Sequence, residues 1–322
     1  MTFEQIIGHD RPKDILRRAL ANDRLAHAYL FEGPEGVGKR LMAVALIRAL
    51  FCKTGTGCGT CPSCRKIDHN NHPDLHLLEA EGNTIKIEQI RGLQKELAYR
   101  PLEAPRKACI IDTAERMNPA ASNALLKTLE EPSADTIIIL LSSRPESLLT
   151  TIRSRCQRLG FARLSQTVLR QVLQDRLNLD ETEGHILAAL SEGSFKKALG
   201  QDRELYLSQR QELIKKIAAL SHGSILPLLQ LAETLAEDKD HLQDLLEILQ
   251  IFYRDLLLAR HGTLEKDFVN IDMLEKIHRL AGRESTAALL TKLEAIDMTR
   301  RQLDRNVNRQ LAMEVLLLRL AA

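Results

Sequence analysis

The residues with the clearest chemistry form a glycine-rich segment, residues 33–40, which reads GPEGVGKR. It matches the phosphate-binding pattern G-x-x-x-x-G-K and stands between an apolar stretch at 28–31 and an apolar, alanine-rich run at 41–51. In that setting, backbone N–H groups and the N-terminus of the following helix point at an anion, and the lysine contacts the β- and γ-phosphates. The candidate residues for the phosphates of ATP or ADP are Gly33, Gly36, Gly38 and Lys39.

The positions that support ATP hydrolysis in a P-loop ATPase have different residue types in this sequence. Arg40 stands where a hydrolysing loop has the Ser or Thr hydroxyl that holds magnesium, and a guanidinium has no lone pair to offer a metal. Asp112 ends a predicted buried strand and fits the second magnesium contact, but Thr113 follows it where a catalytic acid is usual. Glu115, two residues further on, is expected to point elsewhere. We therefore predict no intrinsic ATP hydrolysis, whereas nucleotide binding stays open.

Four cysteines follow the predicted helix of the glycine loop with the spacing C-x5-C-x2-C-x2-C. Four thiolates can close a tetrahedral Zn²⁺ site, and a site with only protein ligands is structural rather than catalytic. The alternative is a redox pair made by Cys61 and Cys64. The predicted zinc ligands are Cys52, Cys58, Cys61 and Cys64.

Arg155 is the fourth candidate, in the tripeptide Ser154-Arg155-Cys156 just beyond a predicted strand. An arginine at this place could reach a neighbouring subunit and stabilise the charge that builds on a γ-phosphate, as an arginine finger does. From the residues alone, a surface salt bridge is the simpler interpretation.

The elements that must position these residues alternate between strands and helices in the first half of the chain. Their strands are almost continuously apolar, which is typical of a parallel sheet covered on both faces. Strands are predicted at 28–32, 75–79, 108–112 and 136–141, and helices at 11–22, 39–51, 87–98 and 119–130.

From about residue 163 the pattern is helical. Asp180 and Glu183 have capping-box spacing, and 179–199 reads as two short helices separated by Gly193. Two apolar stripes follow, and both are expected to face the core of a helix bundle. The first stripe consists of Leu242, Leu245, Leu249, Phe252 and Leu256, and the second of Val307, Leu311, Val315 and Leu318.

Composition sets limits on function. The 322 residues are 44% hydrophobic and 27% charged, with a net charge of +2, so a strongly basic nucleic-acid binder is not indicated. Aromatic residues make up only 3% and Trp is absent, which argues against a base-stacking surface. A polar N-terminus and apolar runs far shorter than the ~20 residues of a membrane helix predict a cytoplasmic protein.

With these motifs in view, the chain resembles the clamp-loader subunits of bacterial DNA polymerase III, which are AAA+ proteins. The resemblance covers essentially the whole chain and is carried by HAYLF at 27–31, the glycine loop, the inserted cysteines, NALLKTLEEP at 123–132 and Ser154-Arg155-Cys156. It implies that Arg155 acts on ATP held by the neighbouring subunit. It also puts Ser142 and Ser143 at the sensor-1 position and Lys196 at the sensor-2 position, where the family's ATPases have Arg.

The same resemblance implies an α/β AAA+ P-loop core at 1–162 with a zinc module at 52–64, a helical lid at 163–203 and an all-α collar at 204–322. The implied partners are the gamma or tau ATPase subunits and the delta subunit in a pentameric ring, with the sliding clamp and primer-template DNA bound through the complex.

The family's ATPase subunits keep Thr after the loop lysine and Glu after the strand aspartate. Arg40 and Thr113 depart from that and fit the non-hydrolysing delta-prime type, a stator within a nucleotidyltransferase holoenzyme. Two alternatives remain: an active gamma-type ATPase that uses Glu115 as its base, and a zinc-module protein that binds nucleic acid.

Overall fold

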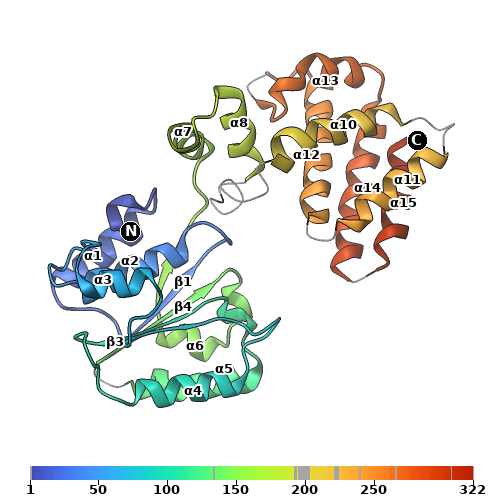
Figure 1. Cartoon of the computed structure of the whole chain (residues 1–322). Helices are drawn as coiled ribbons and strands as arrows, with labels where there is room; N and C mark the ends of the chain where they lie inside the picture. Colours follow the sequence, from blue (N-terminus) through green and yellow to red (C-terminus); the bar gives the residue numbers. More distant parts are fainter. Residues whose placement is uncertain are drawn as a thin grey trace. The chain divides into compact units, whose positions relative to one another are not determined.

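A computed structural model describes residues 2–132, 135–191, 194, 204–220, 225–238, 241–264, 267–305 and 307–321. Contacts divide the chain into two units, one formed by Met1–Leu164 and the other by most of the residues from Ser165 onward (Figure 1). The predicted lid at 163–203 and collar at 204–322 both belong largely to the second unit, and their separation as two domains stays a prediction. Gly193 and Lys196, together with the second short helix predicted before residue 199, lie outside the described residues.

Five parallel strands form the sheet of the first unit, in the order β2-β3-β4-β1-β5. Glu32 lies opposite Ser142 at the end of the β1–β4 pair, and Leu78 lies opposite Ile111 at the end of the β2–β3 pair. The carboxyl ends of these strands therefore meet at one edge, where side chains that follow a strand come together. The strands are β1 (Ala28–Glu32), β2 (Leu75–Leu78), β3 (Lys107–Ile111), β4 (Thr136–Ser142) and β5 (Gln157–Gly160).

Helices cover both faces of this sheet (Figure 1). Tyr29 and Phe31 of β1 pack into one hydrophobic cluster with α1, α2 and α3, whereas Leu30 of the same strand packs into a second cluster with α4, α5 and α6. Burial on both faces explains the continuously apolar strands and confirms the predicted α/β class. The helices are α1 (Asp10–Ala21), α2 (Lys39–Phe51), α3 (Pro62–Asp68), α4 (Ile87–Leu97), α5 (Pro119–Glu130) and α6 (Thr150–Arg155), with short 3-10 turns η1 (Phe3–Gln5), η2 (Ala114–Arg116) and η3 (Pro145–Ser147).

Capping side chains fix the starts of two helices. The Asn118 side chain accepts a hydrogen bond from the Ala121 N–H at 2.7 Å, and the Asp180 side chain accepts one from the Glu183 N–H at 2.7 Å. Each bond satisfies a backbone donor that has no partner within its own helix, which stabilises the helix by about 1 kcal/mol.

The described residues of the second unit form helices and no strand. The long helix α12 buries its predicted apolar stripe, and Leu249, Phe252 and Leu256 are each at most 2% exposed. The helices are α7 (Gln166–Leu177), α8 (Glu181–Leu190), the π-helical turn η4 (Leu205–Gln209), α10 (Arg210–Ala219), α11 (Ile225–Glu237), α12 (Leu242–Arg260), η6 (Ile271–Met273), α13 (Leu274–Ala281), α14 (Thr286–Asp304) and α15 (Arg309–Ala321).

The stripe at the C-terminal end does not lie in the core. Val307, Leu311, Val315 and Leu318 are 40%, 56%, 40% and 45% exposed, so the prediction that they form bundle core was wrong. The core of α15 consists of Ala312, Met313, Leu316, Leu317 and Leu320 instead. Both sets have helical spacing, and periodicity does not identify which apolar face a helix turns inward.

Among the described residues, no helix is both long enough and apolar enough to span a membrane.

Candidate functional site

The glycine loop joins β1 to α2 and needs two of its glycines for steric reasons. Gly33 has a φ of 148°, and a Cβ at this position would lie 2.0 Å from the carbonyl oxygen of Phe161. Gly38 precedes the first residue of α2 with a φ of 104°, in the left-handed region that side chains disfavour. The backbone conformation of the loop therefore requires glycine at these two positions.

Lys39 folds back onto its own loop. Its Nζ donates hydrogen bonds to the carbonyl oxygens of Gly33 at 2.5 Å and Pro34 at 2.6 Å, and the residue is only 9% exposed. Burial lowers the pKa of the Lys39 ammonium, and the Glu115 and Asp112 carboxylates offset part of that effect. The ammonium thus lies inside the loop, bonded to two of its carbonyl oxygens.

Arg40 turns toward the carboxyl ends of two strands. Its Nη1 pairs with Glu79, the residue that follows β2. The same Nη1 lies 3.4 Å from Oδ2 of Asp112, the residue that follows β3. A fixed positive charge therefore lies beside the aspartate expected to contact magnesium. Sequence reasoning did not single out Glu79, although an acid directly after a strand at the same sheet edge was a usable signal.

Thr113 and Glu115 both make hydrogen bonds where β3 and β4 end. The Thr113 hydroxyl donates to the carbonyl oxygen of Asp112 at 2.7 Å. Glu115 Oε1 accepts hydrogen bonds from the Ser143 hydroxyl at 2.5 Å and from the Ser143 N–H at 3.1 Å. Burial raises the pKa of Glu115, but hydrogen bonds from Ser143, from Ser142 and from the Glu115 backbone together outweigh it and lower the pKa. Glu115 thus ties the end of β3 to the end of β4.

The four predicted cysteines come together. Their Sγ atoms all lie within 4.8 Å of one another, and those of Cys52 and Cys61 are 4.0 Å apart. A tetrahedral Zn–S distance of ~2.3 Å corresponds to an S–S separation of ~3.8 Å, so the cluster has the size of a metal centre with four thiolate ligands. The histidines near this segment, His69, His72 and His76, are not part of the cluster.

Backbone donors support the sulfur atoms of this cluster. The Cys58 N–H donates to Cys52 Sγ at 3.3 Å, and the Cys61 N–H donates to Cys58 Sγ at 3.4 Å. Burial raises the pKa of Cys52, but hydrogen bonds from Thr54 and Cys58 lower it to about 5. Burial raises the pKa of Cys64 to about 12, and a coordinated cation would deprotonate that thiol. The donor set fits a thiophilic metal ion.

Arg155, the last residue of α6, has a partner within its own chain. Its Nη2 lies 2.8 Å from Glu130 Oε1, and its Nη1 donates to the Thr151 carbonyl oxygen at 3.1 Å. The side chain is 37% exposed. A surface ion pair of this kind is weak, at about 0–1 kcal/mol, so the guanidinium remains available to a stronger anion.

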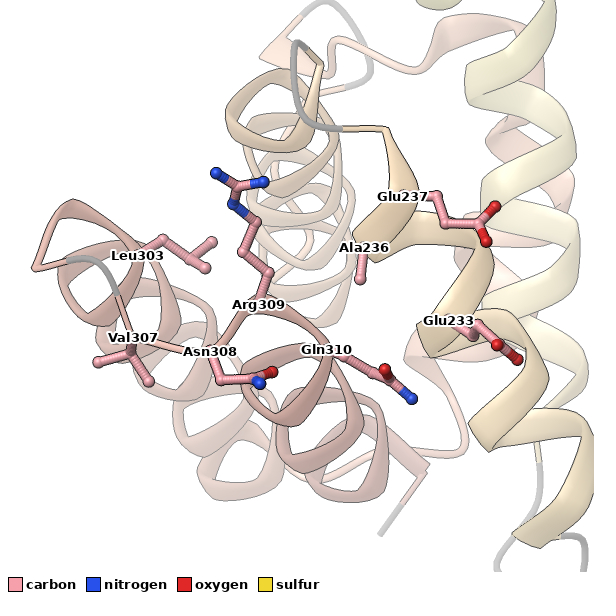
Figure 2. Close-up of a pocket in the computed structure, with 8 residues that line it drawn as sticks. All are labelled: Glu233, Ala236, Glu237, Leu303, Val307, Asn308, Arg309 and Gln310. Atoms are coloured by element: carbon pink, nitrogen blue, oxygen red, sulfur yellow. The ribbon is translucent and has the colours of Figure 1, made fainter.

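A hollow of about 550 Å³ lies in the second unit, beside the exposed stripe on α15. Figure 2 shows Glu233 and Glu237 of α11 on one side and Val307, Asn308 and Gln310 on the other. The lining residues are Glu233, Ala236, Glu237, Leu303, Val307, Asn308, Arg309 and Gln310.

Comparison with known proteins places the chain in a family. Family descriptions reading "DNA polymerase III, delta subunit" and "DNA polymerase III, delta subunit, C terminal" match residues 8–165 and 204–322. DNA polymerase III subunit delta' of Bacillus subtilis is 33% identical over 318 residues, which cover 96% of this chain and 95% of that protein. The chain belongs to the DNA polymerase III delta-prime family. The family expected from the residues is confirmed.

Two further relatives show how the delta-prime family relates to the other subunits. Subunit delta' of Pseudomonas aeruginosa is 42% identical over 136 residues, or 41% of this chain and 42% of that protein. Subunit tau of Escherichia coli is 30% identical over 321 residues, or 95% of this chain but only 48% of that protein. This chain therefore aligns over nearly all of its length with about half of tau.

Proposed function

We propose that this chain is a non-hydrolysing subunit of a bacterial clamp loader and supports ATP-dependent loading of a sliding clamp onto primed DNA. The position of the Arg40 guanidinium carries the proposal, because it pairs with Glu79 and Asp112 where a P-loop ATPase binds magnesium. The Bacillus subtilis relative, which aligns over 95% of its length, is named as a DNA polymerase III subunit, and the proposal extends that role to this chain.

The site retains the means to hold a phosphate but lacks the means to cleave one. Gly33, Gly36, Gly38 and Lys39 could bind the phosphates of ATP or ADP once the Lys39 ammonium leaves its own carbonyl partners. Magnesium would meet a positive charge at Arg40 and an aspartate that is already paired, while Glu115 is engaged with Ser143. The loop is therefore a degenerate nucleotide site in this proposal.

ATP turnover by the purified chain tests this role. We expect no turnover with magnesium present, and no strengthening of ATP or ADP binding when magnesium is added. Turnover on the order of 1 s⁻¹, ordinary for an enzyme, would overturn the proposal and favour a gamma-type motor subunit. Lys39→Ala is the control, since turnover that survives this change comes from a contaminating ATPase.

Arg155 is the proposed contribution of this chain to catalysis, acting on ATP bound by the neighbouring ATPase subunit. It lies at the end of α6, it is partly exposed, and its Glu130 partner forms only a surface ion pair. A γ-phosphate in the transition state carries more charge than one carboxylate and would compete well for the guanidinium.

Zn²⁺ is the proposed ion of the cysteine cluster. Thiolate ligands select soft metals, and four protein sulfurs leave no open position for a substrate. The role assigned to the ion is structural: it closes residues 52–64 into a module attached to the end of α2.

The helical residues 204–322 are the proposed collar, through which this chain joins gamma or tau ATPase subunits and the delta subunit in a pentameric ring. The exposed stripe on α15 and the adjacent hollow support this role, because apolar side chains at 40–56% exposure are buried when a partner covers them. The sliding clamp and primer-template DNA would be bound by the assembled ring.

A further inference from the structure

We propose that Arg48 is the counter-charge of the cysteine metal centre, and that it positions the most buried ligand, Cys64. The inference rests on the proposed zinc site. Arg48 belongs to α2, the helix that begins at Lys39 and ends just before Cys52. Its side chain is 3% exposed, which is rare for an arginine and requires that its charge be compensated nearby.

Contacts place the Arg48 guanidinium against the metal-binding loop. One of its amino groups lies so close to Gly59 that a Cβ there would be 3.1 Å from Nη2. Burial lowers the pKa of Arg48, but its interactions with Asp68 and with the sulfur of Cys64, a fully buried residue, outweigh that effect and raise it.

Asp68 compensates only part of this charge. Its Oδ1 lies 2.9 Å from Arg48 Nη1, but the Asp68 side chain is 45% exposed, so water screens the carboxylate. The Nε–H of Arg48 is buried and has no acceptor among the residues that the structure describes. The Arg48 guanidinium is buried, its carboxylate partner Asp68 is screened by water, and its Nε–H has no acceptor in the described part of the chain. Additional negative charge nearby would therefore stabilise it.

A tetrathiolate zinc centre supplies that charge. One Zn²⁺ and four thiolates carry a net charge of −2, and backbone N–H groups from Cys58 and Cys61 spread this charge without neutralising it. Arg48 adds the nearby positive charge, so it should favour the metal-bound thiolate of Cys64. The same residue connects the metal module to the helix that carries the phosphate loop.

Zinc affinity of the full-length chain, measured by competition with a chromophoric chelator, tests the proposal. Arg48→Gln is expected to weaken Zn²⁺ binding at least about 10-fold, as is usual when a residue that supports a metal ligand is changed. Arg48→Lys keeps the charge and should retain more affinity than Arg48→Gln. Arg65→Gln removes an exposed charge next to Cys64 and is the matched control, with affinity expected to equal that of the parent.

Asp68→Asn distinguishes the proposed role of Arg48 at the metal centre from a role limited to its ion pair with Asp68. It removes the carboxylate but leaves the guanidinium against the cysteine loop, so we expect zinc affinity near that of the parent and an unaltered charge-transfer band in the Co²⁺-substituted protein. Parental zinc affinity in Arg48→Gln, or a loss in Asp68→Asn as large as that in Arg48→Gln, would overturn the proposal. Should Arg48→Gln not fold, the Asp68→Asn result still decides, since an ion-pair role predicts a large loss there. A parent chain that binds no zinc would refute the zinc site itself, which is a distinct outcome.

Discussion

Single side chains determine what the phosphate loop can do. Thr or Ser after the loop lysine would place a small hydroxyl near a metal, whereas Arg40 reaches past that position to Glu79 and Asp112. The backbone of the loop is unaffected, because its shape depends on Gly33 and Gly38 rather than on the residue that follows the lysine. If the proposed function is correct, this loop keeps its fold and lacks a metal site.

Arg155→Ala is predicted to reduce the ATPase activity of a reconstituted complex by about 10³-fold or more at the affected site, as loss of an arginine finger does. The matched control is Arg158→Ala, because Arg158 is also exposed and paired with a carboxylate, Glu32, at 2.9 Å. Steady-state ATP turnover at saturating ATP is the measurement. Equal activities of the two variants would refute the finger role.

At this scale the sequence predicts residue types but not their partners. The phosphate-loop residues and the four cysteines follow from local spacing, and the structure brings the cysteines together. Glu79 and Glu130 do not follow from spacing, since each meets its arginine only after the chain has folded. Tertiary packing determines which carboxylate in the chain pairs with each arginine, and the spacing of residues in the sequence does not show it.

Among the elements, the segment before β3 depends on one buried aspartate. Asp74 is fully buried and accepts hydrogen bonds of 2.8 Å from the backbone N–H groups of Leu102, Glu103 and Ala104. Burial raises the pKa of Asp74, but these three donors outweigh it and lower the pKa below its usual value. The charged carboxylate therefore holds the backbone at the entry to β3.

Asp74→Ala is predicted to destabilise the first unit by about 2–3 kcal/mol at pH 7, the contribution of hydrogen bonds to a charged group. Because the folded pKa is lowered, the stabilisation is present above the unfolded pKa near 4 and is lost as pH falls through the folded value. Urea unfolding at pH 7 and at progressively more acidic pH measures both effects. Asp14→Ala, at an exposed aspartate of α1, should change stability by less than about 0.5 kcal/mol. A loss in Asp74→Ala that stays constant down to acid pH would contradict this account.

Prediction of elements succeeds where burial and periodicity agree. Helices α4 and α5 and strands β1, β3 and β4 have apolar patterns long enough to be recognised, and they lie within two residues of their predicted bounds. β5 has a single buried residue, and α3 and α6 span only seven and six residues, so no period is visible in them. The short elements form because long neighbours already provide a surface to pack against.

For the whole molecule, the exposed stripe on α15 is the feature that an isolated chain does not explain. Leu311 at 56% and Leu318 at 45% exposed contribute no core packing, while apolar residues on the opposite side of α15 fill the core. If the proposed collar is correct, a neighbouring subunit buries this stripe. A charge placed there should then weaken assembly and leave the fold of this chain unchanged.

Leu311→Glu is accordingly predicted to lower the affinity for the gamma or tau and delta partners at least about 10-fold, because desolvating a carboxylate in an apolar contact costs more than about 1.4 kcal/mol. The melting temperature of the isolated chain should match that of the parent. Gln171→Glu adds the same charge at an exposed position on α7 and is expected to assemble normally. Size-exclusion chromatography of the mixed subunits, followed by titration calorimetry, measures the difference. If Leu311→Glu assembled as well as Gln171→Glu, the interface would have to lie on another face, and the apolar stripe would need a different partner.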